Sequence, residues 1–144
     1  MMRLSSIEDY EDILQISKES FPIPWSENEY FKIYDYDSYQ VYVYEVEQKV
    51  CAYAIFYFPY GNEEVELLQI AVAPYYRNQK IAKVFLEHIL LRLQKRNYQE
   101  VFLEVSSENK VAYKLYQNLG FEVIAVRKDY YSKNIDAYVM RKRF

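Results

Sequence analysis

The sequence predicts one mixed α/β domain of the α+β kind, with a central sheet of about seven strands flanked by about four helices. A chain of 144 residues that is 51% hydrophobic and 27% charged is long and apolar enough to form one packed core. Alternating residues between positions 39 and 73 are typical of an antiparallel meander. Residues 66–91 then change from a strand pattern to a helical pattern across a short turn at Pro74. Because no repeat or linker divides the chain, we expect residues 1–144 to form a single domain.

The N-terminal segment predicts a short strand followed by a helix. Met2–Leu4 is expected to be the opening strand. Ser6, with Asp9 three residues later, resembles a helix N-cap with an acidic partner, and the apolar residues that follow have helical spacing. Pro22 and Pro24 disfavour helix in the residues before them, so this helix is expected to end at F-P-I-P.

A second helix and a three-stranded meander follow. Ser26 with Glu29 repeats the capping box and starts a helix over residues 27–34. In the first strand of the meander valines alternate with tyrosines, so each kind is expected on its own face of the sheet. The predicted strands are residues 39–46, 50–58 and 65–73, with a turn in P-Y-G-N before the third.

The C-terminal half alternates between helix and strand before a closing pair of strands. Residues 80–96 are apolar on most faces, so this helix is expected to be buried against the sheet. Gly120 fits the C′ position of a helix over residues 108–119. The other predicted elements are strands at residues 100–105, 121–128 and 135–143, of which the last two form a hairpin.

Composition and charge argue against several classes of protein. No apolar run is long enough to span a bilayer, and the acidic residues near the N-terminus argue against a signal peptide. A single cysteine, Cys51, cannot form an internal disulfide, which suits a reducing cytoplasm. One histidine and one cysteine without ligand spacing predict no metal site. A net charge of −3 gives no general footprint for nucleic acid, so we expect a cytoplasmic protein without direct nucleic-acid or membrane contacts.

The strand–turn–helix within residues 66–91 has the geometry of an anion site. A strand that leads into a helix through a tight turn directs several backbone N–H groups, and the positive end of the helix dipole, at one point. The N–H groups of residues 78–83 are therefore candidates to bind a phosphate group. Taken alone, this pattern would suit any phosphate ligand.

Five features, in order along the chain, resemble the GNAT family of acetyl-CoA-dependent N-acetyltransferases. The turn signature of that family, Q/R-x-x-G-x-G/A, corresponds here to R-N-Q-K-I-A at residues 77–82. Four motifs resemble the branch of bacterial ribosomal-protein-alanine N-acetyltransferases: P-W-S at 24–26, L-E-V at 103–105, N-x-x-A-x-x-L-Y-x-x-L-G-F at 109–121, and Y-Y followed by D-A-x-x-M at 130–140. The resemblance implies the GNAT fold and direct transfer of acetyl to a protein N-terminal α-amine in a ternary complex.

The resemblance also implies which residues bind acetyl-CoA as the co-substrate. Backbone groups of Ile70, Ala71 and Val72 would hold the thioester carbonyl and the pantetheine. Asn109 would bond to the cofactor from the start of the next helix. The diphosphate would be held at the turn and the helix start, by Arg77, Asn78, Gln79, Lys80, Ile81, Ala82 and Lys83.

The resemblance implies two catalytic residues, each with a simpler alternative. Glu104 would be the general base, acting through water, although its spacing alone suggests a solvated strand residue. Glu66, on the neighbouring strand, is the rival base, because other GNAT enzymes place theirs there. Tyr116 would donate a proton to the departing thiolate, and it lies seven residues after Asn109, about two helical turns away on the same face. The alternative for Tyr116 is an ordinary core tyrosine.

Acid–base chemistry favours an N-terminal amine as the acceptor. The reference pKa of an α-amine is about 7.7–8.0 and that of lysine about 10.4, a difference of roughly 3.4 kcal/mol in deprotonation. Trp25, Tyr130 and Tyr131 either line the entrance for the acceptor peptide or simply pack loops onto the sheet. The expected partner is the N-terminus of a ribosomal protein, and the enzyme is expected to be a monomer or a weak dimer.

One residue departs from the family pattern. Lys80 stands where the family has glycine, and in a left-handed conformation it would cost on the order of 1 kcal/mol. Its ammonium group could offset that cost by reaching a phosphate. Two other functions stay open: acetylation of a small amine or a lysine, and a non-catalytic acetyl-CoA-binding module. His88 and Cys51 are interpreted as core residues.

Overall fold

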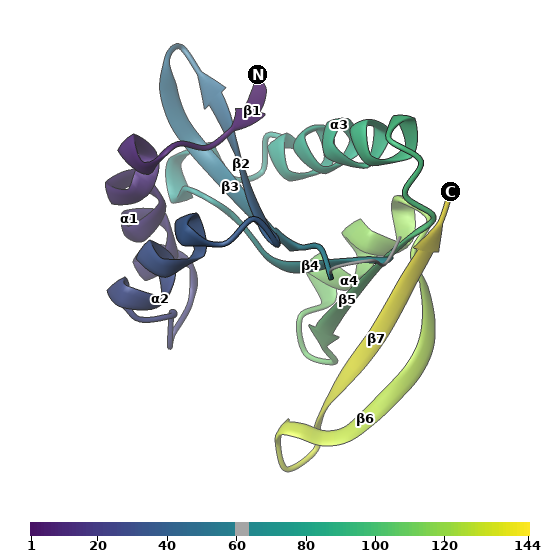
Figure 1. Cartoon of the computed structure of the whole chain (residues 1–144). Helices are drawn as coiled ribbons and strands as arrows, with labels where there is room; N and C mark the ends of the chain where they lie inside the picture. The colour runs from purple at the N-terminus through teal and green to yellow at the C-terminus, as the bar shows by residue number, and fades with distance from the viewer. Residues whose placement is uncertain (60–63) are drawn as a thin grey trace.

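The computed structural model describes residues 1–59 and 64–144, and Figure 1 shows how the sheet connects the elements. The strands are β1 (Met2–Leu4), β2 (Tyr39–Val46), β3 (Lys49–Tyr57), β4 (Glu64–Val72), β5 (Glu100–Ser106), β6 (Glu122–Ser132) and β7 (Ile135–Arg143). The α-helices are α1 (Tyr10–Ser20), α2 (Glu27–Lys32), α3 (Ile81–Lys95) and α4 (Lys110–Asn118), with 3-10 turns η1 (Ile7–Asp9), η2 (Ile33–Asp35) and η3 (Pro74–Tyr76). The predicted α+β fold is confirmed for the described residues; residues 60–62 of the predicted P-Y-G-N turn lie outside them.

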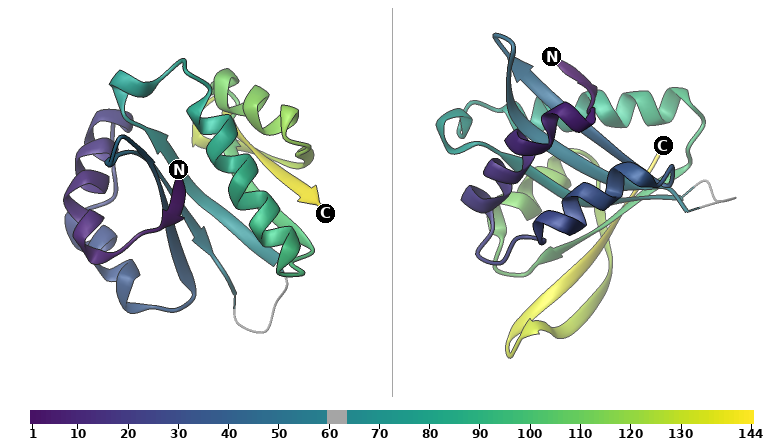
Figure 2. Two further views of the ribbon diagram at one scale, coloured as in Figure 1. Left: turned by 90° about the horizontal axis from the view of Figure 1, so that it is seen from above. Right: turned by 60° about the vertical axis from the view of Figure 1, so that its left-hand side comes forward.

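The sheet has the strand order β1-β2-β3-β4-β5-β7-β6. All neighbouring strands are antiparallel except β4 and β5, which are parallel and are connected through α3. Helices α1 and α2 cover one face of the sheet, and α3 and α4 cover the other (Figure 2). The β6–β7 hairpin extends beyond the rest of the molecule (Figure 1).

Two hydrophobic cores lie on opposite faces of the sheet. Val41 and Val43 of β2 belong to the core beneath α1 and α2, whereas Tyr42 and Tyr44 belong to the core beneath α3 and α4. The alternation predicted for this strand is therefore confirmed. Cys51 is fully buried in β3, as predicted for a small apolar residue.

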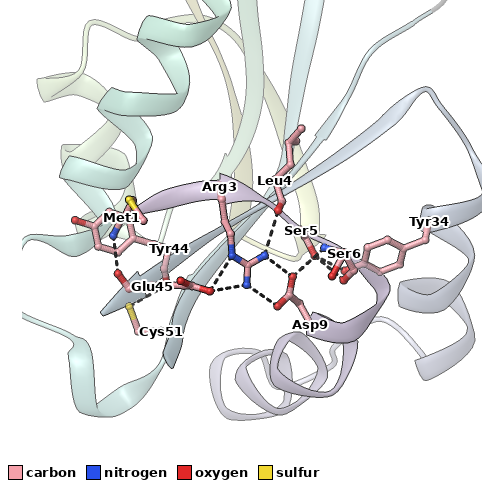
Figure 3. A network of polar contacts seen from close by, with 10 residues as sticks. All are labelled: Met1, Arg3, Leu4, Ser5, Ser6, Asp9, Tyr34, Tyr44, Glu45 and Cys51. Atoms are coloured by element: carbon pink, nitrogen blue, oxygen red, sulfur yellow. Dashed lines mark hydrogen bonds and ion pairs between the residues drawn. The ribbon is translucent and has the colours of Figure 1, made fainter. Parts of the chain in front are cut away.

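A charged network holds the N-terminal strand to the first helix (Figure 3). Arg3 of β1 donates two hydrogen bonds of 2.8 Å to the carboxylate of Asp9, and a third of 2.8 Å to Glu45. The backbone N–H of Ser6 donates to Asp9 at 2.9 Å, which confirms the predicted acidic partner at the start of the helix. The first turn is the 3-10 turn η1 rather than α-helix. Arg3 lowers the pKa of Asp9 through this hydrogen bonding, so the network is charged at neutral pH.

The interpretation of the long helix is confirmed in one part and wrong in another. Helix α3 is buried against the sheet, as predicted, through one stripe of side chains made by Phe85, Leu86, Ile89, Leu90 and Leu93. The physical reason is that the sheet contacts only the residues recurring at three- and four-residue spacing, while the other side chains face solvent. His88 lies between these buried pairs and is exposed, so its interpretation as a core histidine was wrong.

The parallel strands β4 and β5 separate part way along their length. Their pairing runs from Glu64 opposite Glu100 to Leu67 opposite Leu103, and the register given for the described residues ends there. At the next residue, Leu68, the pairing of β4 with β3 contains a bulge. A bulge bends a strand and re-aims the side chains that follow. Beyond it, β4 and β5 diverge and leave a cleft between them.

Candidate active site

The cleft between the diverging strands has a volume of about 850 Å³. The last residues of β4 form one wall, and the end of β5 with the start of α4 forms the other. The end of α1 and the β6–β7 hairpin complete the lining. The predicted site residues that line it are Ile70, Ala71, Val72, Arg77, Ala82, Glu104, Asn109, Tyr116 and Tyr131. The fold thus brings together residues that the sequence separates by up to 61 positions, from 70 to 131.

Strand β4 presents a backbone edge to this cleft. Between Gln69 and Val72 its other edge pairs with β3, while the edge toward β5 lies beyond the end of the parallel pairing. Backbone N–H and C=O groups on an open edge can bind an extended ligand as a neighbouring strand would. Ile70, Ala71 and Val72 therefore offer backbone groups with which an extended, amide-containing chain could pair.

The turn after β4 is built from left-handed residues and leads directly into α3. Asn78 has a φ of 62°, and Lys80, the N-cap of α3, has φ 61° and ψ 19°. The helix then begins at Ile81 with N–H groups that have no partner within a helix, at the positive end of the dipole. The predicted turn and helix start are thus present, and the binding of an anion there stays a prediction.

Arg77 anchors this turn across the mouth of the cleft. Its Nε donates to the carbonyl oxygen of Val72 at 3.0 Å, and its Nη2 donates to Ser20 Oγ at 3.1 Å and to the carbonyl oxygen of Glu19 at 3.3 Å. These bonds tie the turn to the C-terminal end of α1. The side chain of Arg77 is therefore engaged by the protein through Nε and Nη2, and its binding of the diphosphate stays a prediction.

Of the other predicted diphosphate ligands, Ala82 lines the cleft, and the rest lie on its rim outside the lining. The amide of Gln79 donates to the carbonyl oxygen of Tyr75 at 3.1 Å, which closes the turn. Lys83 forms an ion pair of 3.9 Å with Glu87 one helical turn later. Asn78, Lys80 and Ile81 complete this rim through their backbone.

Glu104 projects from β5 into the cleft and is paired with a residue that the sequence did not indicate. Its Oε1 lies 3.1 Å from Nη1 of Arg127 on β6, and 26% of the Glu104 side chain is exposed. The guanidinium of Arg127 also lies 5.5 Å from the ring centroid of Tyr130. The spacing of Arg127 in the sequence carried no signal, because it meets Glu104 only through the strand order β5-β7-β6.

Glu66 lies on the neighbouring strand but outside the main cleft. It lines a smaller hollow with Pro59 and Phe102. Burial, followed by the negative charge of Glu104, raises the pKa of Glu66, and Arg127 opposes this shift. The two carboxylates are thus electrostatically linked, but Glu104 is the one of the two that faces the large cleft.

Tyr116 reaches the cleft from the buried face of α4. Its ring packs against Phe121 with the centroids 5.8 Å apart, and its side chain belongs to the core beneath α3 and α4. Burial raises the pKa of Tyr116 to about 12, with a further contribution from Tyr131. The phenol is therefore protonated at neutral pH and able to donate a proton or hydrogen bond. It is a core tyrosine and a cleft residue at once.

Asn109 begins α4 at the edge of the cleft. Its Oδ1 accepts a hydrogen bond of 3.2 Å from the backbone N–H of Ala112, so it is the N-cap of the helix. The side-chain amide NH₂ group can still donate hydrogen bonds while the oxygen caps the helix. Asn109 can therefore serve the helix and a ligand together.

The three aromatic residues predicted for the acceptor entrance have different positions. Tyr131 lines the cleft. Trp25 packs against Tyr30, with ring centroids 5.4 Å apart, in the core beneath α1 and α2, which matches the packing alternative. Tyr130 is half exposed and contacts Tyr131 edge-to-face at 5.1 Å, outside the cleft lining. The structure thus groups Tyr131, and not the other two, with the cleft residues.

The fold and the site together define an acyltransferase with an open strand edge and a helix N-terminus at one cleft. The sequence profile of the Acetyltransferase (GNAT) family matches residues 10–121. The chain belongs to the GNAT family of acetyltransferases, whose co-substrate is acetyl-CoA, and it is an acetyl-CoA-dependent N-acetyltransferase. Within the described ranges, no group of three or more His, Cys, Asp or Glu side chains could hold a metal ion, and no helix is long and apolar enough to cross a membrane.

Several known proteins are similar over almost the whole chain. The [Ribosomal protein bS18]-alanine N-acetyltransferase of Escherichia coli K12 is 32% identical over 133 residues, which cover 91% of this chain and 88% of that protein. The enzyme of the same name from Haemophilus ducreyi is 30% identical over 86% of this chain and 83% of its own. The crystal structure of the ribosomal-protein-S18-alanine N-acetyltransferase from Escherichia coli superposes with a TM-score of 0.92 at 28% identity, covering 99% of this chain and 92% of that one.

Proposed function

We propose that this protein transfers the acetyl group of acetyl-CoA to the N-terminal α-amine of a ribosomal protein that begins with alanine. The observation that carries the proposal is the convergence of the β4 edge, Glu104 and Tyr116 at one cleft. The names of its relatives, which act on ribosomal protein bS18, support this choice of acceptor.

The cofactor is proposed to lie along β4 with its diphosphate at the start of α3. Bound acetyl-CoA supplies an activated thioester. The open backbone edge of β4 between Ile70 and Val72 orients the pantetheine, and a backbone N–H there stabilises the negative charge that develops on the thioester oxygen. The turn at Asn78 and Lys80 directs N–H groups toward the diphosphate. Asn109 bonds to the cofactor from the far wall.

Glu104 and Tyr116 are proposed to move the two protons of the reaction. Glu104, as a carboxylate, accepts a proton from the acceptor amine through water, which frees the nitrogen lone pair for attack. Tyr116 donates its phenolic proton toward the sulfur that departs as thiolate. Direct transfer in a ternary complex needs no covalent acyl-enzyme, and it suits a cleft in which the cysteine of the chain, Cys51, is buried elsewhere.

The acceptor class can be tested with a panel of amines. A peptide beginning with alanine, the same peptide with a blocked N-terminus and an internal lysine, and a polyamine would each be incubated with the protein and acetyl-CoA. Mass spectrometry would then locate the acetyl group. We expect acetylation at the α-amine of the first peptide. Acetylation of lysine or polyamine, with the free N-terminal peptide unmodified, would overturn the acceptor assignment. No binding of acetyl-CoA at millimolar concentration by calorimetry would overturn the enzyme itself.

A further inference from the structure

A second hollow lies on the exposed side of α3, away from the catalytic cleft. Its volume is about 710 Å³. None of the described residues that line it also lines the large cleft. Its lining residues are Met1, Met2, Tyr44, His88, Leu91, Arg92, Lys95 and Arg96. The α3 residues among them recur at three- and four-residue spacing, so they form one face of the helix beside β1.

This face carries a concentration of positive charge in a chain whose net charge is −3. Arg92, Lys95 and Arg96 have no carboxylate within ion-pair distance in the described part of the chain. Of the acidic side chains near this end of the sheet and on α3, Glu45 is paired with Arg3 and Glu87 with Lys83. Like charges one helical turn apart repel each other, so the face is favourable for an anion.

Arg92 provides the second observation. Its Nε is fully buried and has no hydrogen-bond acceptor among the described residues. Its guanidinium lies 5.9 Å from the ring centroid of Tyr42, which covers one side of it. The same guanidinium also interacts with the phenol of Tyr42, which lowers the pKa of Tyr42 against the larger effect of burial. A buried donor without an acceptor is destabilising, and an oxyanion paired with this guanidinium from the hollow would offset part of that cost.

The position of Arg92, Lys95 and Arg96 near the C-terminus of α3 does not fully explain why these cations gather at a hollow. Cations in the last helical turn interact favourably with the helix dipole, which accounts for part of the charge. The dipole does not account for the hollow, nor for the buried Nε of Arg92. The apolar side chains of Met1, Met2 and Leu91 beside the cations also have no role in a dipole interaction.

We propose that this hollow is a binding site for a small organic polyphosphate with an apolar or aromatic body, of the nucleoside triphosphate class. The two guanidinium groups match phosphate oxygens with paired donors, and Lys95 adds charge along a phosphate chain. Leu91, Tyr44 and the methionines contact the apolar body. The size of the hollow is in the range of about 300–1,000 Å³ that is usual for small-ligand sites. The proposal does not depend on acetyl transfer.

The test is calorimetric titration with GTP, inorganic tripolyphosphate and guanosine. The protein is first saturated with CoA, so that phosphate binding at the start of α3 does not contribute. We expect saturable binding of one GTP per chain, with tripolyphosphate and guanosine each at least tenfold weaker. Absence of GTP binding at millimolar concentration would overturn the proposal. Equal affinity for tripolyphosphate and GTP would overturn the role of the apolar residues.

Variants locate the site and separate it from general electrostatic binding. Arg92→Gln with Arg96→Gln should weaken GTP binding at least tenfold, while Arg92→Lys should weaken it less. Lys32→Gln removes the same kind of charge from an exposed position on α2 and should have no effect. Thermal unfolding of each variant shows that it is folded, and Arg96→Gln alone serves if the double variant is not. An equal loss in Lys32→Gln would contradict the assignment, as would Arg92-dependent binding of single-stranded RNA without binding of GTP.

Discussion

Arg127 and Glu104 face each other across β7, with Nη1 of the arginine 3.1 Å from Oε1 of the glutamate. The proposed base is thus already paired with a cation before an acceptor arrives. Burial and the charge of Glu104 raise the pKa of Glu66, and Arg127 opposes this rise. The acceptor amine therefore meets a carboxylate in the cleft that is already paired with a guanidinium. Such a pair favours the ammonium form of the amine less strongly than an unpaired carboxylate would.

Replacing Arg127 with glutamine should strengthen the binding of the acceptor peptide and slow its turnover. Without the guanidinium, Glu104 attracts the ammonium form of the acceptor more strongly and raises the pKa of its amine. We expect KM for the acceptor peptide and kcat at pH 7 both to fall, by roughly three- to tenfold, with kcat recovering toward pH 9. Lys128→Gln is the matched control, since Lys128 pairs with Asp136. Unchanged kcat across this pH range would contradict the role of Arg127.

The choice between the two candidate bases can be made with paired substitutions. Glu104→Gln keeps the size of a side chain that lines the cleft and removes its basicity, so kcat should fall on the order of 10²-fold. Glu66→Gln should change kcat little, because Glu66 lies outside the cleft. Affinity for acetyl-CoA, measured by calorimetry, should be retained in both variants. The reverse order of effects would assign the base to Glu66.

Tyr116→Phe removes the proposed proton donor and keeps the ring that packs on Phe121. We expect kcat to fall roughly 10²-fold with acetyl-CoA affinity largely intact. Because the pKa of Tyr116 is raised to about 12, the phenol stays protonated over the usual assay range. The wild-type rate should therefore show no decline from ionisation of Tyr116 below about pH 10. Turnover by Tyr116→Phe at the wild-type rate would leave Tyr116 with a packing role only.

Local features of the fold could be predicted from the sequence because they depend on neighbouring residues. The caps at Ser6 and Ser26 and the alternating faces of β2 are of this kind, since each follows from a spacing of two or three residues. The exposure of His88 could not be predicted in this way. Apolar residues surround it in the sequence, but the sheet contacts one stripe of α3.

Long-range features of the site needed the structure. The ion pair of Glu104 with Arg127 depends on the strand order and on the irregular pairing of β6 with β7 after Arg127. The cleft itself follows from the bulge at Leu68, which no turn residue in β4 signals. Trp25 illustrates the limit of motifs: the P-W-S motif supported the family, while the ring itself packs on Tyr30.

The Arg3–Asp9 pair should stabilise the fold in a pH-dependent way. Asp9→Asn replaces a buried carboxylate that accepts two bonds from Arg3, and we expect it to lower the free energy of unfolding at pH 7 by about 1–2 kcal/mol. The folded-state pKa of Asp9 is lowered, so its contribution is present above the ordinary carboxyl pKa of about 3.9 and is lost as the pH falls below it. Urea unfolding of the wild type and of Asp9→Asn at pH 7 and pH 3 measures the loss of stability and its dependence on pH. A difference between variant and wild type that is as large at pH 3 would contradict the electrostatic origin.

At Lys80 the left-handed backbone destabilises the fold, while the ammonium group is placed to attract a phosphate of the cofactor. Two substitutions separate these effects. Its φ of 61° confirms the left-handed conformation in which a side chain is unfavourable. Lys80→Gly should relieve that strain and raise the free energy of unfolding by up to about 1 kcal/mol, less the entropy that glycine adds to the unfolded chain. Lys80→Gln keeps the strain and removes the charge, so acetyl-CoA should bind several-fold more weakly if the ammonium group contacts a phosphate.

The salt dependence of binding completes the comparison at Lys80. Calorimetry at low and high ionic strength should show a smaller loss of acetyl-CoA affinity with salt in Lys80→Gln than in wild type, because one screened interaction is gone. Lys114→Gln, an exposed change of the same charge on α4, provides a reference. If Lys80→Gln binds acetyl-CoA like the wild type while Lys80→Gly binds it more tightly, the lysine is only a conformational burden at this position. Weaker binding in both variants would instead show that its charge offsets the left-handed backbone.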